Sequence, residues 1–373
     1  MGHVLEAQLH LCSRDPADMG AASLAFRRAQ ALPQNERERM HLEAIYSGLR
    51  GDYERAARLL AGVLARNPRD LLALAVSHTI DHYLGDTRDL QERVAAVMPA
   101  WSRPDPGYHS VLAMFAFALE ESGDYVRAEE AAFAALALEP RDLRAHHARC
   151  HALEMQARAA EGLRWMEQRA AHWDGPGASA THVWWHLALY HLELGGARRA
   201  LELYDGRIGA ATAPSVSELI DAAALLWRLE LRGIDSGLRW RRLAEHWAPH
   251  AGDAFCAFND LHAMLAFVGA RRLDLVGRLA RTQRRGLALG GTYESMLREV
   301  GLPACEALAA FGNGDYARAA RLLRGLPERS HRIGGSHAQR GLIGLTLRAA
   351  EQRSRAISAR TATPARGVQT VPA

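Results

Sequence analysis

The segment HHARCHALE, residues 146–154, brings three histidines, a cysteine and a glutamate into nine positions. On a helix, His147, His151 and Glu154 follow one another at i, i+4 and i+7 and share one face. Two imidazole nitrogens and one carboxylate oxygen in that arrangement could bind a divalent metal ion, or could perform acid–base chemistry without one. Polar recognition, or a structural role between helices, is the alternative use of the same three residues.

The elements that must position this segment follow from an internal repeat. The stretches GDYERAARLL (51–60), GDYVRAEEAA (123–132) and GDYARAARLL (314–323) are near copies. Weaker copies complete a series of turn positions: Gly51, Gly85, Gly123, Ala157, Gly195, Gly233, Gly269 and Gly314. A recurring step of about 34 residues is the tetratricopeptide period of one helix–turn–helix unit. The pattern therefore predicts an all-α fold, a tetratricopeptide-type helix–turn–helix solenoid of about nine helix pairs in a right-handed superhelix.

The repeat also predicts the domain organisation. A first unit is expected over residues 1–34, and a final unit is expected to start near Ser336. Together the units form a single repeat domain over residues 1–352. The helical periodicity is lost in residues 353–373, so we expect a disordered C-terminal tail there.

The inner helices, which precede the turn positions, are expected to line the concave surface where such solenoids bind their ligands. Twelve of the eighteen histidines fall on these helices: His41, His78, His82, His109, His146, His147, His151, His182, His186, His191, His262 and His337. The pairs His78/His82, His147/His151 and His182/His186 each have the i, i+4 spacing with which one helical turn can chelate a metal ion. By their register, His78 and His262 should instead face neighbouring helices, each bonded to a backbone carbonyl.

These positions define a candidate site. The catalytic candidates are His151 (general base or ligand), Glu154 (general acid or ligand), His262 and His337. The ligand-binding candidates are His147, His186, His191, Trp185, Glu120, Asn259, Asp260, Gln339 and Arg340, the last as a clamp for an anion. The metal-binding candidates are His147, His151 and Glu154. The sequence requires no cofactor. If the protein has one, these residues are suited to bind a divalent metal ion.

Composition narrows the class of protein. Hydrophobic residues make up 49% of the chain and charged residues 24%, as in an ordinary globular protein. The chain has no apolar run of about eighteen residues, and its start lacks the pattern of a signal peptide, so we expect a cytoplasmic protein without a membrane partner. The net charge is +4, but the charges alternate in sign along the helix faces. We therefore expect no nucleic-acid partner.

Five blocks within about residues 105–345 carry a family resemblance: AHHARCHALEMQARAAEGLRWM, WWHLALYHLELG, DAAALLWRLELRGIDSGLRW, AFNDLHAMLAFVGA and HRIGGSHAQRG. In these blocks the chain resembles the tetratricopeptide repeat protein 38 family. The resemblance implies an all-helical repeat protein with counterparts of His147, His151, Glu154, His186, His191, Asn259, Asp260, His262, Ser336, His337, Gln339 and Arg340. It implies no established reaction or substrate. The chain departs from the family pattern at Ala157, where a glycine is expected, and near Gly341, where an acidic partner for His337 or Arg340 is expected.

Two functions fit these observations. The first is a protein that binds a peptide, a protein or a small ligand in its concave, histidine-rich groove. The second is an enzyme, metal-dependent or based on His/Glu acid–base chemistry, that acts on a small molecule in a closed polar pocket. They differ in whether the superhelix is open or closed, and in whether the four side chains His151, His186, His262 and His337 meet. At separations of about 15 Å or more these side chains could not form one site, because direct contact needs about 3 Å.

Overall fold

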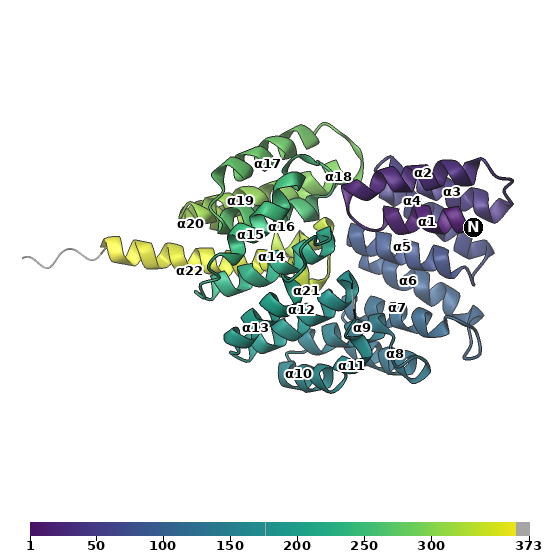
Figure 1. Cartoon of the computed structure of the whole chain (residues 1–373). Coiled ribbons are helices and arrows are strands. Elements are labelled where there is room, and N and C mark those ends of the chain that lie inside the picture. The colour runs from purple at the N-terminus through teal and green to yellow at the C-terminus, as the bar shows by residue number, and fades with distance from the viewer. Residues whose placement is uncertain (176, 363–373) are drawn as a thin grey trace, which may run out of the picture.

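The structure, a computed structural model, describes residues 1–175 and 177–362. Over these residues the predicted all-α fold is confirmed: helices pack in sequential helix–turn–helix pairs, and there is no β-strand (Figure 1). None of the described helices is long and apolar enough to cross a membrane.

The helices alternate between an inner and an outer layer of the array. The inner helices are α3 (Glu36–Leu49), α5 (Leu71–Leu84), α7 (Tyr108–Glu121), α9 (Leu143–Met155), α12 (Ala178–Glu193), α14 (Val216–Leu231), α16 (Ala257–Gly269) and α19 (Leu302–Gly312). The outer helices are α4 (Tyr53–Arg66), α6 (Thr87–Val97), α8 (Tyr125–Leu138), α10 (Ala159–Gln168), α13 (Ala197–Leu203), α15 (Arg239–Trp247), α17 (Leu273–Gly286) and α20 (Tyr316–Leu323). The chain begins with α1 (Gly2–Leu11) and α2 (Met19–Gln30), and its last helices are α21 (His337–Arg340) and α22 (Leu342–Ala362). Short connecting segments are η1 (Pro16–Asp18), η2 (Met98–Ala100), α11 (Ala170–Trp173), η3 (Tyr204–Ile208), η4 (Ala248–Gly252), α18 (Gly291–Met296), η5 (Leu297–Gly301) and η6 (Pro327–Ile333).

The Gly-Asp pair that marks the repeat builds the turn between an inner and an outer helix. Gly51 has a φ of 77°, a left-handed conformation that a residue without a Cβ adopts without strain. The Asp52 side chain then accepts a hydrogen bond from the backbone N–H of Arg55 at 3.0 Å and caps α4. Gly314 and Asp315 repeat this arrangement before α20. The sequence marker of the repeat is thus a helix stop followed directly by a helix start.

Two turns depart from this pattern. Ala157 adopts a φ of 56° at the position where the family pattern expects a glycine. The turn predicted at Gly269 is displaced by two residues, because Gly269 is the last residue of α16 and the left-handed residue is Arg271, with a φ of 56°. A Cβ on Gly269 would overlap the ring of Trp240. That glycine therefore allows close packing of α16 against α15.

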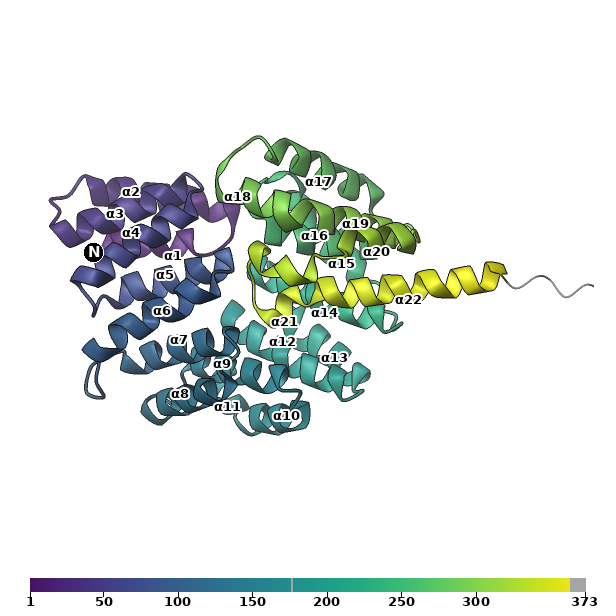
Figure 2. The ribbon, with the colours of Figure 1, turned by 180° about the vertical axis from the view of Figure 1, so that it is seen from behind.

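The array of helix pairs closes into a ring, because its last units return to its first. The backbone N–H of Thr292 in α18 donates to the carbonyl of Gly51 at 3.1 Å, and the Thr292 hydroxyl accepts from the N–H of Tyr53 at 3.2 Å. Asn259 of α16 donates its side-chain amide to the carbonyl of Arg14 at 2.9 Å. Figure 1 and Figure 2 both place α18 beside the N-terminal helices. The inner helices therefore surround a central space instead of lining an open groove.

The backbone of Gly85 lies against the carbonyl of His331 in η6, so a substitution at Gly85 tests whether this contact holds the ring closed. A Cβ on Gly85 (φ 68°) would overlap the carbonyl oxygen of His331 in η6, whereas Gly123 (φ 83°) has open space at the same position. We expect Gly123→Ala to cost about 1 kcal/mol through backbone strain, and Gly85→Ala about 2 kcal/mol more through lost packing of η6. Urea denaturation measures both costs, and small-angle scattering should show a larger radius of gyration for Gly85→Ala alone. Equal costs with equal radii would show that this contact does not hold the ring closed.

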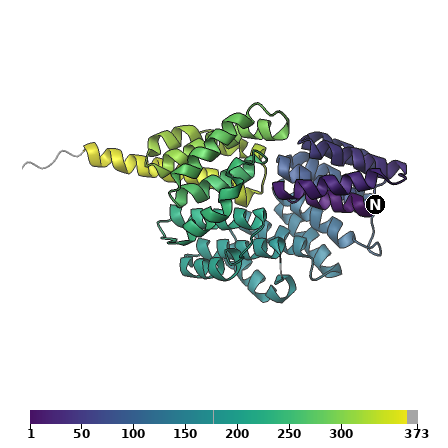
Figure 3. The ribbon, with the colours of Figure 1, turned by 45° about the horizontal axis from the view of Figure 1, so that its top comes forward.

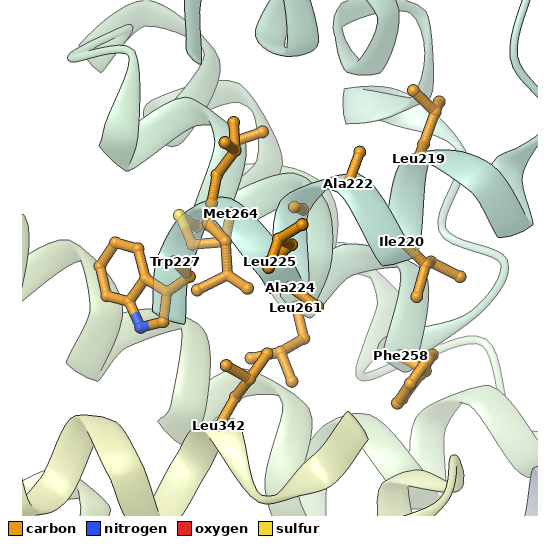
Figure 4. Packing of buried hydrophobic residues seen from close by; sticks show 14 of the residues in the cluster. Leu219, Ile220, Ala222, Ala224, Leu225, Trp227, Phe258, Leu261, Met264 and Leu342 are labelled. Carbon is orange, nitrogen blue, oxygen red and sulfur yellow. The ribbon is translucent and has the colours of Figure 1, made fainter. Parts of the chain in front are cut away.

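The largest hydrophobic core fixes α14, the inner helix that carries Asp221 and Arg228. Figure 4 shows Trp227 of α14 packed with Met264 of α16 and Leu342 of α22. The indole N–H of Trp227 donates to the hydroxyl of Thr346 in α22 at 2.9 Å, which satisfies a polar group that is otherwise buried. Apolar burial and this one hydrogen bond thus hold α14 at a defined distance from the central space.

The helix α22 extends away from the ring (Figure 1, Figure 2 and Figure 3). We expected disorder from residue 353 onward, but α22 continues to Ala362, so this expectation is wrong for residues 353–362. The Arg353 guanidinium lies 4.9 Å from the ring centroid of Phe311, and this contact ties the middle of the helix to α19. The rest of the predicted tail, residues 363–373, lies outside the described residues.

Candidate functional site in the central cavity

A cavity of about 610 Å³ lies on the inner side of the ring, and we call it the central cavity. Five successive inner helices line it (α5, α7, α9, α12 and α14), together with Arg14 from the loop before η1 and Gln339 from α21. The titratable residues of the lining are Arg14, His78, His82, Tyr83, His109, Glu139, Arg141, Asp142, Arg144, His147, His182 and Asp221. Met114 and Phe117 contribute an apolar wall. This volume is typical of sites for small molecules.

Four histidines from two neighbouring inner helices gather beside the central cavity, and we call them the histidine cluster. His147 and His151 come from α9, and His182 and His186 come from α12. One nitrogen atom of each lies within 4.8 Å of one nitrogen of every other member. The Nε2 atoms of His147 and His151 are 2.9 Å apart. The two pairs stand 35 residues apart in the sequence, so they occupy equivalent positions of successive units and the repeat aligns them.

Two carboxylates contact the α12 pair. Nδ1 of His182 lies 2.9 and 2.8 Å from the two carboxylate oxygens of Asp221. Nδ1 of His186 lies 3.1 Å from Oε2 of Glu154. An ionised carboxylate only accepts hydrogen bonds, so when Asp221 and Glu154 are charged both contacts place the imidazole proton on Nδ1 and leave a lone pair on Nε2. Nε2 of His186 is buried and has no hydrogen-bond partner among the described residues.

Burial controls the charge of these groups. It lowers the pKa of His147, His151 and His186 well below the ordinary imidazole value, and neighbouring imidazoles lower it further. Burial also raises the pKa of the Glu154 carboxyl to about 7, while the Arg228 guanidinium opposes that change. At neutral pH the imidazoles of His147, His151 and His186 are therefore uncharged.

Two adjacent buried carboxylates at the end of α7 differ in charge. Glu121 accepts the backbone N–H of His337 at 3.0 Å and pairs with the Arg340 guanidinium at 3.0 Å. Burial acts to raise the pKa of Glu121, but His337 and Arg340 together hold it below its ordinary value. Burial and the neighbouring Glu121 charge raise the pKa of Glu120 well above its ordinary value, and Oε2 of Glu120 lies 3.8 Å from Nδ1 of His151. Glu121 is therefore the charged member, and it ties α21 to α7 across the ring.

Three arginines of the cavity lining lack an acidic partner. Among the residues that the structure describes, none forms an ion pair with Arg14, Arg141 or Arg144. Arg14 is only 7% exposed, its guanidinium carbon lies 3.6 Å from the ring centroid of Tyr83, and its Nε has no hydrogen-bond partner. Of the three acidic residues of the lining, Asp142 contacts Nδ1 of His109 at 2.6 Å, Asp221 contacts Nδ1 of His182, and Glu139 has no cationic side-chain partner among the described residues. The guanidinium groups of the lining are thus cations without a direct counter-ion.

The structure brings together part of the predicted site. The rings of His147, His151 and His186 have centroids 4.4 to 5.2 Å apart. His337 reaches the same region through its contact with Glu121. His262 does not join them, because its Nδ1 bonds to the carbonyl of Phe258 at 2.8 Å, as its register predicted. His78 bonds in the same way to the carbonyl of Met114 at 3.1 Å, which confirms the second prediction of this kind.

Other predicted ligand residues lie away from the cavity, because part of each inner helix packs against its neighbours. The carboxylate of Asp260 accepts a hydrogen bond from the Tyr293 hydroxyl at 2.8 Å inside the core of α16 and α18. His191 lies beyond the histidine cluster along α12, 3.9 Å from Glu167. Trp185 is fully buried and stacks on the ring of His182, with centroids 5.2 Å apart, behind the cavity wall.

The structure also changes the roles predicted for two residues. Glu154 is outside the group of potential ligands that includes His147 and His151, because it contacts the Nδ1 of His186. The α12 histidines complete that group instead. Arg340 was predicted to clamp an anion, but its guanidinium is taken by Glu121 and by the carbonyl of Gly335.

Arg14, Arg144 and Asp221 line the cavity but are not among the site residues predicted from the sequence. Asp221 had a signal only in its place near the start of α14, the next inner helix after α12. Arg144 likewise lies one residue into an inner helix, three positions before His147. Arg14 had none, because it lies in a loop outside the repeat and only the closure of the ring brings it to the cavity.

No family model matches the chain. Among solved structures, the chain is similar to one in the crystal structure of the APC/C hetero-tetramer Cut9-Hcn1, with a TM-score of 0.44 and 11% sequence identity. The similarity covers 88% of this chain and 58% of that chain, so this chain spans less than two thirds of that protein. The protein is an all-α, tetratricopeptide-like helical-repeat protein.

Proposed function

We propose that this protein binds a small anionic molecule in the central cavity. The observation that carries the proposal is that the cavity arginines Arg14, Arg141 and Arg144 have no acidic partner among the described residues. A buried cation without a counter-ion is costly, and Arg14 is almost fully buried. A carboxylate or phosphate on the ligand would supply the missing charge, and the planar guanidinium groups suit bidentate contacts with either.

The shape of the molecule favours a small ligand over an extended peptide. Contacts such as Asn259 to Arg14 and Thr292 to Gly51 join the two ends of the array, so the inner surface is a cavity of limited length. The wall at Phe117 is apolar, so a ligand with an anionic group and a small apolar part fits the lining. Peptide or protein binding remains the alternative outcome of the tests below.

We also propose that the chain is a relative of the tetratricopeptide repeat protein 38 family. Support comes from the blocks around HHARCHALE and HRIGGSHAQRG, which hold His147, His151, His337 and Arg340.

The experiment is a binding screen by calorimetry in the presence of a chelator. Phosphate monoesters and short dicarboxylates are compared with neutral alcohols and amides of the same size. We expect binding by anions alone, weakened by added salt because the contacts are charged. Arg144→Gln, at an exposed position, should weaken binding about 10-fold or more, as a lost hydrogen bond to a charged group does.

The matched control is Arg198→Gln on the outer helix α13, where the arginine is also exposed. It should leave the affinity unchanged. Equal affinity of the wild type and Arg144→Gln for every anion, or saturable binding of uncharged peptides alone, would refute the proposal.

A further inference from the structure

The histidine cluster has an arrangement of nitrogen atoms that anion binding does not explain. Its rings pack tilted or edge to face, with centroid separations of 4.4 Å for His151–His186 and 4.9 Å for both His147–His182 and His182–His186. The ring nitrogens of the four imidazoles face one another. An apolar side chain would fill the same space without leaving a buried nitrogen unpaired. Such an unpaired group calls for a ligand or a strained structure.

The nitrogen positions are close to those of a metal-binding polyhedron. Bonds of about 2.0–2.1 Å to a tetrahedral zinc ion place ligand nitrogens about 3.3 Å apart. In the cluster, the Nε2 atoms of His147 and His151 are 2.9 Å apart, and all four ligand atoms fall within 4.8 Å of one another. The buried Nε2 of His186 has no hydrogen-bond partner among the described residues, so its lone pair is unused.

The residues around the histidine cluster are those expected around a metal site. Metal-ligating histidines usually donate the other ring N–H to a carboxylate, which fixes the tautomer and aims the ring. Asp221 accepts from Nδ1 of His182 at 2.8 Å, and Glu154 accepts from Nδ1 of His186 at 3.1 Å. These carboxylates come from α14 and α9, so three inner helices cooperate in orienting one pair of rings.

The neighbouring group of Glu120, Glu121 and His151 is a weaker candidate. Its ligand atoms are also close together, but Glu121 is already neutralised by Arg340 at 3.0 Å and is buried with it. A divalent cation there would have to displace a buried guanidinium.

We propose that His147, His151, His182 and His186 together bind one divalent transition-metal ion, of the class that prefers imidazole ligands, such as Zn²⁺. Glu154 and Asp221 position the α12 pair and do not ligate the ion. Because His147 and His182 also line the central cavity, the ion would lie at its wall. This inference is independent of the proposed anion site, which uses Arg14, Arg141 and Arg144.

The test uses the full chain without an added histidine tag, stripped with a chelator and then titrated with Zn²⁺ or Co²⁺ alone. We expect one ion per chain by elemental analysis after dialysis, and a visible Co²⁺ spectrum of four-coordinate type. Asp221→Asn should weaken Zn²⁺ binding roughly 10- to 100-fold, as the loss of an outer partner does. His182→Ala should weaken it at least as much, and because this residue is partly exposed the variant should fold, which circular dichroism checks.

The matched control is the double variant His78→Ala with His82→Ala. This pair has the same i, i+4 spacing, also lines the central cavity and is separated from the cluster by the ring of Phe117. It should bind Zn²⁺ like the wild type. Substoichiometric metal in the wild type, or equal loss of binding in the control and in His182→Ala, would overturn the inference.

Discussion

Replacement of Glu121 by glutamine should lower the free energy of unfolding by about 4 kcal/mol, the usual cost of breaking a buried ion pair from one side. The Arg340 guanidinium is only 5% exposed, and Glu121 is the one carboxylate that it contacts among the described residues. Glutamine keeps the size of the side chain but not its charge, so the buried cation would lose its counter-ion. The backbone N–H of His337 would also lose a charged acceptor. Urea denaturation at neutral pH measures the change.

Two further variants separate the ion pair from a general effect of substitution. The surface pair Arg332–Glu299, at 2.9 Å, is partly exposed, so Glu299→Gln should cost less than about 1 kcal/mol. The double variant Glu121→Gln with Arg340→Gln should be more stable than the sum of the single changes predicts, because the uncompensated charge is gone. Additive single and double costs would show that the two side chains are not coupled.

Replacement of Asp260 by asparagine should make the protein less sensitive to pH. Burial raises the pKa of this carboxyl to about 7, although hydrogen bonds from Tyr293 and Gln283 oppose that change. In the unfolded chain an aspartate titrates near pH 4. Between about pH 4 and pH 7 the folded state therefore binds more protons than the unfolded state, and stability falls as the pH rises through this window. Over these about three pH units the free energy of unfolding falls by roughly 4 kcal/mol.

The measurement compares the wild type and Asp260→Asn by denaturation at several pH values from 4 to 8. The difference in unfolding free energy should shift in favour of the variant as the pH rises, and it should level off above about pH 7. Glu328→Gln, at an exposed position in the same half of the chain, should instead run parallel to the wild type. Parallel curves for Asp260→Asn as well would show that Asp260 is ionised in the fold at all these pH values.

The repeat architecture could be predicted from the sequence because its signals are local. Each Gly-Asp pair ends one helix and starts the next within a few residues, as at Gly51 and Asp52. The same rule misplaced the turn near Gly269, since a glycine required for packing against Trp240 resembles a glycine required for a turn. Local signals therefore give the helix order, and errors arise where one residue type serves two purposes.

The composition of the site was only partly predictable. The pairs His147/His151 and His182/His186 could be identified by spacing within a helix, and the repeat step aligns them. Arg14 reaches the cavity through contacts between residues more than 200 positions apart, such as Asn259 to the Arg14 carbonyl. Those contacts depend on the summed rotation of all the units between them, and no local pattern encodes that sum.

Closure of the ring also limits the lengths that this protein can have. In an open solenoid each unit touches only its neighbours, so a whole unit can be added or removed without disturbing the rest. Here one extra helix pair would displace Thr292 from Gly51 and Asn259 from Arg14, and would open the cavity between them. The number of repeats is therefore set by geometry, as ring size is in a macrocycle, and units cannot be exchanged for longer or shorter arrays.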